Sequence, residues 1–147
     1  MKTITIATIF IISSSLFANS YTAGLQEYRQ KHYKKAIELY TQAMYAKNYK
    51  AELNLAYMYN QGIGITVNYT KAFNLYKKAY QDGSKLASYD IAAMYYLGQG
   101  VSKNYQKAIK WWDISALQGN QRAAYVLSIM CAKHPLMCHF KRNTNEQ

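Results

Sequence analysis

A repeated unit of about 36 residues constrains the fold of this chain more than any other feature of its sequence. Lys71-Ala72-Phe73 aligns with Lys107-Ala108-Ile109, and the same offset carries through both flanks. The other aligned pairs are Tyr59 with Tyr95, Gly62 with Gly98, Gly64 with Gly100, Asn68 with Asn104, Tyr76 with Trp112, and Gly83 with Gly119. Shorter matches continue one unit back, at Tyr33, Ala36, Tyr40 and Ala43, and one unit forward, at Ala123, Tyr125 and Leu127. Agreement at so many positions indicates internal repetition rather than chance.

Each unit is predicted to form two helices. In the unit that starts at Ala51, apolar or small residues recur three or four apart, which is one helical face. Gly62 and Gly64 favour a helix end, and Asn68 is suited to cap the next helix through its side chain. The expected helices are Thr22–Gln30, His32–Ala46, Lys50–Gln61, Asn68–Gln81, Lys85–Leu97, Asn104–Leu117 and Gln121–Lys133. A helix pair cannot bury its apolar face alone, so we expect the pairs to stack.

The units resemble the Sel-one-like repeat, a relative of the tetratricopeptide repeat. The shared pattern is a small residue and tyrosine in the first helix, Gly-x-Gly, a polar cap, Lys-Ala, an aromatic residue, alanine and glycine. The resemblance implies an all-α, right-handed α-α superhelix (solenoid) of about three helix pairs and a closing helix. Its expected units lie near residues 21–50, 51–86 and 87–122, with the closing helix over 121–133.

The sequence departs from that family pattern in three places. Ala56 and Ala92 stand where glycine is common, and asparagine replaces the usual aspartate cap. Cys131 and His134 replace the tyrosine and glycine of a continuing repeat, so we expect the array to end there. Residues 134–147 would then form a C-terminal tail.

The first twenty residues are typical of a secretory signal peptide. Lys2 gives a positive start, an apolar stretch follows over residues 4–12, and Ala18 and Ser20 provide small residues before a cleavage site at Tyr21. The apolar stretch is shorter than the roughly 20 residues of a membrane-spanning helix. We therefore expect residues 1–20 to be removed, with no stable membrane insertion afterwards and with the periplasm, or secretion, as the destination.

The chain is strongly basic, with a formal net charge of +11. The predicted leader holds Lys2 and no acid, so the mature charge would be 11 − 1 = +10. Such a charge favours an acidic protein, an anionic polymer or a membrane surface as a partner. The lysines form no basic block and accompany no nucleic-acid motif, so a nucleic-acid partner is not expected.

No pattern of catalytic residues is present. The two Gly-x-Gly elements follow no strand and lack the residues of a phosphate-binding loop, so we interpret them as turns. Acidic residues are few, and no pair suits general acid–base catalysis. The sequence predicts a protein without enzymatic activity and without a cofactor.

The only residues with metal-ligand chemistry cluster near the C-terminus, as Cys131, His134, Cys138 and His139. A disulfide between Cys131 and Cys138 is the favoured interpretation for an exported chain, because Pro135 ends the helix and allows the chain to turn back. Zinc binding and free thiols remain alternatives.

The outward positions of the first helix of each unit are the candidates for partner binding. The tetratricopeptide arrangement implies that these helices line a concave groove. Tyrosines flanked by polar residues have the composition of a protein-binding surface, although each ring could instead pack between repeats. The candidates are Leu53, Asn54 and Tyr57, with Lys50 and Asn60 beside them; Tyr89, Asp90, Ala93 and Tyr96, with Leu97; and Arg122, Tyr125 and Ile129, with Val126.

Three hypotheses for function follow. The first is protein–protein interaction in the bacterial envelope, as an adaptor, regulator, host-interaction factor or immunity protein. The second is binding to the cell wall or another anionic polymer. The third is weak β-lactam hydrolysis, which the family resemblance links to members with a cysteine pair in every repeat; this chain has one pair in all. The oligomeric state and the partner's identity are not encoded in any motif.

Overall fold

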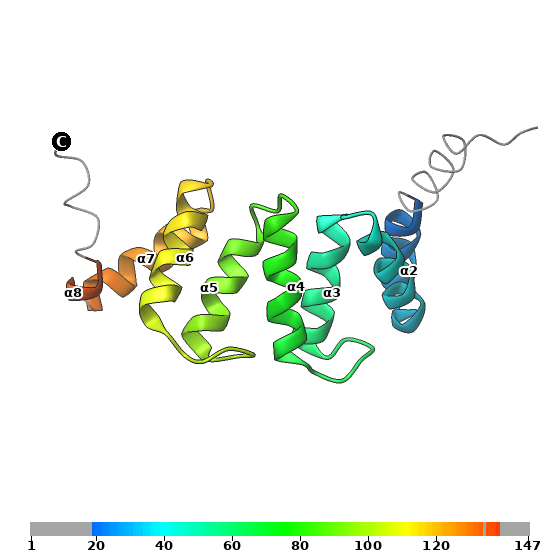
Figure 1. The fold of residues 1–147 in the computed structure, drawn as a ribbon, viewed down its shortest axis with the longest axis horizontal. Coiled ribbons are helices and arrows are strands. Elements are labelled where there is room, and N and C mark those ends of the chain that lie inside the picture. Colours follow the sequence, from blue (N-terminus) through cyan, green and yellow to red (C-terminus); the bar gives the residue numbers. More distant parts are fainter. Residues whose placement is uncertain (1–18, 134, 139–147) are drawn as a thin grey trace, which may run out of the picture.

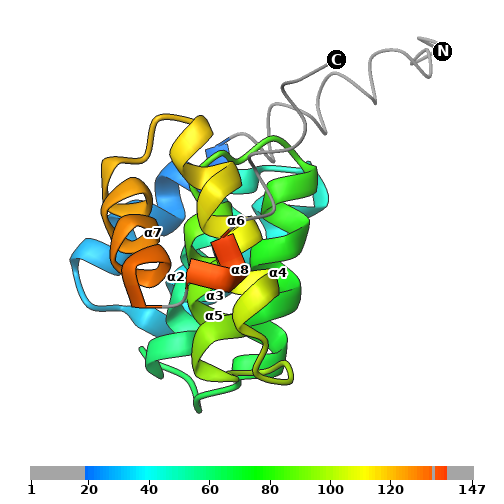
Figure 2. The same ribbon diagram turned by 90° about the vertical axis from the view of Figure 1, so that its left-hand side faces the viewer.

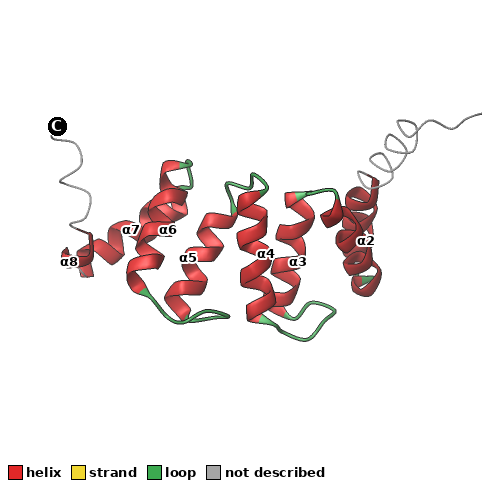
Figure 3. Ribbon diagram, in the orientation of Figure 1, coloured by secondary structure: helices red, strands yellow, loops and turns green. Residues whose placement is uncertain are grey.

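The computed structural model describes residues 19–133 and 135–138, and all regular secondary structure in these ranges is helical (Figure 3). Residues 19–29 form the first described helix. It is followed by α2 (Tyr33–Tyr45), α3 (Tyr49–Gln61), α4 (Tyr69–Gln81), α5 (Ala87–Leu97), α6 (Tyr105–Leu117), α7 (Gln121–Lys133) and the short α8 (Pro135–Cys138). Most of the expected leader, residues 1–18, lies outside the described ranges.

The helices follow one another in space in the order of the chain (Figure 1). The helix over residues 19–29 and α2 lie at one end, and α7 and α8 lie at the other. Each helix packs against the next, both within a pair, as α3 on α4, and between pairs, as α4 on α5. A view along the length shows the helices rotated around the axis rather than aligned in one plane (Figure 2). The chain is an all-α superhelix of paired helices, as the sequence predicts.

Two groups of helices are distinguished below. The helix over 19–29, α3, α5 and α7 are the first helices of their units, and α2, α4 and α6 are the second helices. Asn68 and Asn104 cap α4 and α6 as predicted, since each side-chain Oδ1 accepts the backbone N–H of the third residue onward at 2.9 Å. The predicted helix boundaries agree with the structure to within one residue, except that the first helix begins at residue 19 rather than Thr22 and α5 begins at Ala87 rather than Lys85. The amide of Ser84 donates to the carbonyl of Ala79 at 2.8 Å, which keeps the chain in the turn that closes α4.

Small residues fill the places where helices approach most closely. The alanines at repeated inward positions are fully buried, including Ala36, Ala72 and Ala108. A large ring recurs beside them and is also buried, as Tyr40, Tyr76 and Trp112. Alternating small and large side chains allows dense packing between neighbouring helices. The buried residues form two adjacent clusters, a larger one over α2 to α5 and a smaller one over α5, α6 and α7, and Tyr95 and Trp111 pack against both.

The second glycine of each Gly-x-Gly element lies against the unit before it. Gly100 has φ +69°, and a Cβ built there would overlap the main chain of Tyr69, where α4 begins. Gly64 has the same φ, and its Cβ would overlap the Cβ of Tyr33, where α2 begins. These elements are turns, as predicted, and their second glycines also lie close against the unit before them.

A polar contact joins the start of each first helix to the end of its second helix. In the α3–α4 unit, Lys78 Nζ lies 2.6 Å from Glu52 Oε1 and 2.6 Å from Asp82 Oδ2. In the α5–α6 unit, Ser88 and Gln118 stand at the positions of Glu52 and Asp82, and Ser88 Oγ donates to Gln118 Oε1 at 2.8 Å. The same link is thus ionic in one unit and neutral in the next.

Cys131 and Cys138 form a disulfide, with their Cα atoms 5.4 Å apart. The bridge connects α7 to α8, which also packs against α6. Both sulfurs are therefore unavailable as zinc ligands. His134 and His139 lie outside the described residues.

Candidate functional site

The predicted binding residues lie on three first helices. Leu53, Asn54 and Tyr57 belong to α3; Tyr89, Asp90, Ala93 and Tyr96 belong to α5; Arg122, Tyr125 and Ile129 belong to α7. Tyr57 is 48% exposed and Tyr125 is 68% exposed, so both rings are available to a partner. Arg122 is also exposed. Binding by these residues stays a prediction.

Some of the predicted rings also contribute to packing. Tyr96 lies 5.3 Å from Tyr105 and 5.5 Å from Trp112, measured between ring centroids. Tyr89 packs against the core formed by α5, α6 and α7, and Leu53 packs against the larger core next to it. Tyr57 and Tyr125 are therefore the better probes of binding, because their replacement removes little buried surface.

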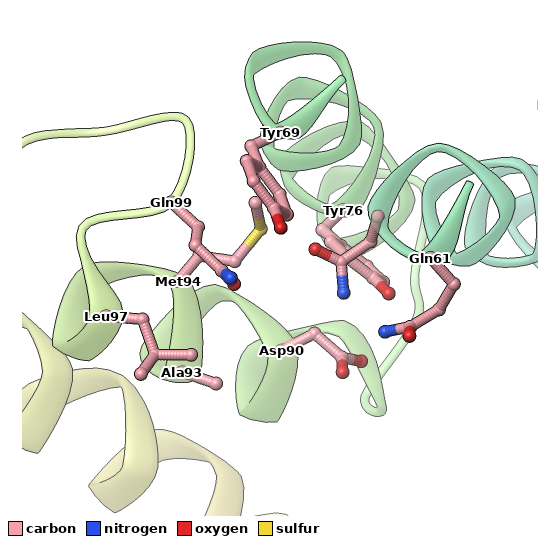
Figure 4. A pocket seen from close by; sticks show the side chains of 9 residues that line it. Gln61, Tyr69, Tyr76, Asp90, Ala93, Met94, Leu97 and Gln99 are labelled. Carbon is pink, nitrogen blue, oxygen red and sulfur yellow. The ribbon is translucent and has the colours of Figure 1, made fainter. Parts of the chain in front are cut away.

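A recess of about 270 Å³ opens between α3 and α5 (Figure 4). Asn60 and Gln61 line it from α3, and Asp90, Ala93, Met94 and Leu97 line it from α5. Tyr69 and Tyr76 enter from α4, and Gln99 follows α5 in the next turn. The structure thus brings Asp90 and Ala93 of the predicted set together with the neighbouring candidates Asn60 and Leu97. Leu53, Asn54, Tyr57, Tyr89, Tyr96 and the α7 residues do not line the recess.

Tyr69 and Tyr76 were not among the predicted binding residues. The repeat pattern assigns Tyr76 to the inward stripe of α4, and its ring is indeed buried. Its edge nevertheless reaches the recess, on the side toward which Asp90 points (Figure 4). Its place at the recess depends on how α3 and α5 are arranged around α4, which no local pattern encodes.

Asp90 is the dominant charge in the recess. Burial raises the pKa of its carboxyl to about 6, and no other cause contributes. In the described part of the chain no lysine, arginine or histidine nitrogen forms an ion pair with it, whereas Glu27, Glu52 and Asp82 all have such pairs. Burial also raises the pKa of Tyr76, and the Asp90 carboxylate adds to that rise. Asp90 is therefore an ionised group at neutral pH that lacks compensation from its surroundings.

A second polar atom in the recess lacks a partner. Asn60 Oδ1 is buried and accepts no hydrogen bond from the described residues. Buried acceptors in folded proteins are usually satisfied, so an orphaned one calls for an explanation. Two residues that line the recess, Asp90 and Asn60, thus have side-chain oxygens without a hydrogen-bond donor in the described part of the chain.

Charge is distributed unevenly between the helices. The second helices carry Lys34, Lys35, Lys71, Lys77, Lys107 and Lys110, all exposed. In α5, Asp90 is the one charged residue, and the helix holds no lysine or arginine. The recess is therefore a local acidic site in a strongly basic protein.

Replacing Asp90 with asparagine is expected to stabilise the protein at neutral pH. The folded-state pKa of about 6 lies above the unfolded value of 3.8, so this group's contribution is fully favourable below pH 3.8 and is lost as the pH rises through 6. At about 1.4 kcal/mol per unit, and allowing for remaining exposure, Asp90→Asn should raise the free energy of unfolding by about 2 kcal/mol at pH 7.5. Urea unfolding at pH 7.5 and pH 4 measures the effect.

The matched control is Glu38→Gln, which changes the net charge equally at an exposed site on α2. It should leave stability unchanged at both pH values, and Asp90→Asn should match the parent protein at pH 4. A loss of stability in Asp90→Asn at pH 7.5 would show that the carboxylate is compensated in the folded protein.

The described residues contain no group of three or more histidine, cysteine, aspartate or glutamate side chains placed to hold a metal ion. None of the described helices is long and apolar enough to span a membrane. The recess and the exposed tyrosines present aromatic rings, hydrogen-bond acceptors and side-chain amides at the protein surface.

Repeated helix pairs that stack into one superhelix define an α-helical repeat protein. The family model of the Sel1 repeat matches residues 21–47, 50–84 and 85–120, which is more than half of the chain. The chain belongs to the Sel1 repeat family, the one that its sequence resembles. This repeat fold typically serves protein–protein interaction.

Solved structures of bacterial proteins share the fold. A Sel1 repeat protein from Oxalobacter formigenes has 27% sequence identity and a TM-score of 0.72, and the match covers 77% of this chain and 46% of that one. A protective antigen of uropathogenic Escherichia coli has 25% identity and a TM-score of 0.76, covering 80% of this chain and 26% of the antigen. The chain thus spans less than half the length of both.

Cysteine-rich protein B of Helicobacter pylori has 18% identity and a TM-score of 0.66, over 86% of this chain and 100% of that protein. At this identity the likeness concerns the fold. No curated protein sequence is similar enough to count as a relative.

Proposed function

We propose that this chain is an exported, non-enzymatic protein of the bacterial envelope that binds another protein through its first helices. The observation that carries the proposal is that the first helices present exposed tyrosines, Tyr57 on α3 and Tyr125 on α7, and that a polar recess opens between α3 and α5. Tyrosine provides a rigid anchor with little entropy to lose, and such rings dominate many protein interfaces. The family's usual role in protein–protein interaction supports the same function.

The test is capture of a partner from an envelope extract with the tagged protein. One protein should be retained in stoichiometric amount, and the double variant Tyr57→Ala with Tyr125→Ala should reduce its retention at least about tenfold, as expected for hot-spot rings. The matched control is Tyr45→Ala with Leu117→Ala, because these side chains are 75% and 77% exposed but belong to second helices. Equal loss in both double variants would contradict binding through the first helices.

Export has separate support. The leader pattern over residues 1–20 is one observation, and the Cys131–Cys138 disulfide is another, because structural disulfides persist in oxidising compartments. Asn19 and Ser20 belong to the leader pattern and are also the first two residues of the first described helix. Ser20 Oγ lies 3.4 Å from Gln42 Oε1. Cell fractionation with mass spectrometry should find a shortened, oxidised chain in the periplasm. A full-length chain with reduced cysteines in the cytosol would overturn the proposal of export.

Binding to an anionic polymer is a second candidate function, favoured by the exposed lysines of α2, α4 and α6. Its signature would be sedimentation with purified cell-wall sacculi that moderate salt abolishes, since such binding depends on screened charges. Protein binding through the tyrosines should persist at the same salt concentration.

A further inference from the structure

The recess between α3 and α5 contains a charged group without a counter-charge, and its chemistry indicates which ligand would bind there. Asp90 is a half-buried carboxylate that lines the recess and has no cation beside it in the described part of the chain. A carboxylate that has lost part of its hydration and has no counter-charge is stabilised by a cation that binds beside it. A ligand that brings positive charge and several N–H donors would pair with the Asp90 carboxylate.

We infer that this recess binds the guanidinium group of an arginine side chain presented by the protein partner. Arginine carries five N–H donors in a flat, permanently charged group. The recess offers the Asp90 carboxylate and the side-chain amide oxygens of Gln61 and Gln99 as acceptors. The inference rests on the proposed protein-binding function and adds which side chain the surface selects.

The shape of the recess fits a side chain better than a free metabolite. Its volume of about 270 Å³ lies below the usual range for pockets that enclose a whole small-molecule ligand. The rings of Tyr69 and Tyr76 border the space that the acceptors surround (Figure 4). A guanidinium plane can stack on such rings, whereas a lysine ammonium has three donors and no plane.

The net charge of the protein argues against non-specific binding of a cationic side chain. A chain with a formal charge of +11 repels cations at long range, so non-specific attraction would favour anions. Any saturable binding of a cation to this protein must therefore arise at a local acidic site. In α5 that site is Asp90, in a helix without a basic residue.

The experiment titrates three small probes into the ¹⁵N-labelled protein and follows backbone amide shifts by NMR. The probes are Nα-acetyl-arginine amide, the corresponding lysine amide and the corresponding citrulline amide, in which a neutral urea replaces the guanidinium. The arginine probe should give saturable shifts at Asp90, Ala93 and Leu97. The lysine probe should bind several-fold more weakly, and the citrulline probe should give no saturation.

Variants locate the site. Asp90→Asn should weaken arginine binding at least about tenfold, because a charge-assisted hydrogen bond becomes a neutral one. Glu38→Gln, with the same change in net charge as Asp90→Asn, should leave it unchanged. Circular dichroism of each variant confirms that the fold is retained.

Each outcome bears on the inference. Equal binding of the citrulline and arginine probes, or equal binding to the parent and Asp90→Asn proteins, would overturn it, as would tighter binding of the lysine probe. The titration needs no partner, so it is independent of the capture experiment. Loss of partner capture in the Tyr57 and Tyr125 double variant together with absent probe shifts would retain the function and reject the arginine site.

Discussion

Gly100→Ala should be the most destabilising of the substitutions considered for this protein, lowering the free energy of unfolding by about 4 kcal/mol. Two effects combine. Gly100 has φ +69°, a conformation that costs an L-residue about 1–2 kcal/mol. The new Cβ would also overlap the main chain of Tyr69, and a backbone cannot rotate away as a side chain can, so α4 and α5 must separate. Urea unfolding followed by circular dichroism measures the loss.

Gly119→Ala is the matched control for this prediction. Gly119 has φ +92°, but a Cβ there would meet nothing within 4 Å. Its replacement should therefore cost only the backbone term, about 1 kcal/mol. If the two substitutions cost the same, the contact between Gly100 and Tyr69 does not contribute to the joining of successive units.

Lys78→Met should lower the free energy of unfolding by about 3 kcal/mol at pH 7.5. Lys78 lies between two carboxylates, and the Glu52 side chain is completely buried. Removing one partner of a buried ion pair typically costs 3–5 kcal/mol, because the other charge is left uncompensated. Lys78 is itself 41% exposed, which places the expectation at the lower end.

The loss should shrink as the pH falls. Burial already raises the pKa of Glu52 while Lys78 opposes that rise, and Lys78 is the main cause that lowers the pKa of Asp82. Without Lys78, Glu52 has a still higher folded pKa, so its ionisation removes stability as the pH rises above 4.5. The stabilisation that Asp82 contributes above pH 3.8 in the parent protein is lost as well. Both effects act in the same direction, and the variant should approach the parent at pH 4.

The protein contains its own control for this network. In the next unit, the positions of Glu52, Lys78 and Asp82 are occupied by Ser88, Ile114 and Gln118. There Ser88 and Gln118 form a neutral hydrogen bond. The triple variant Glu52→Ser, Lys78→Ile, Asp82→Gln copies that arrangement and should recover most of the stability lost in Lys78→Met. A triple variant as unstable as Lys78→Met would mean that the loss arises from packing of the lysine stem, not from the uncompensated charge.

Much of the site could be placed on its helices from the sequence alone. The repeat pattern places Asp90, Ala93 and Tyr125 on first helices, and the resemblance to tetratricopeptide repeats implies that they occupy outward positions there. The recess itself could not be predicted in this way. Tyr69 and Tyr76 belong to α4. Their position at the recess between α3 and α5 depends on the rotation of each helix pair relative to the next.

The sequence by itself determined the helix pairs, their caps at Asn68 and Asn104, their number and the family, since each depends on residues close together in the chain. The tertiary structure alone decided that Gly100 lies against Tyr69, that Lys78 pairs with a buried Glu52, and that Asp90 has no cation beside it in the described part of the chain. These contacts join residues from different helices, and their free energies depend on burial. Burial is set by the superhelical curvature, which arises from the packing of all the units together.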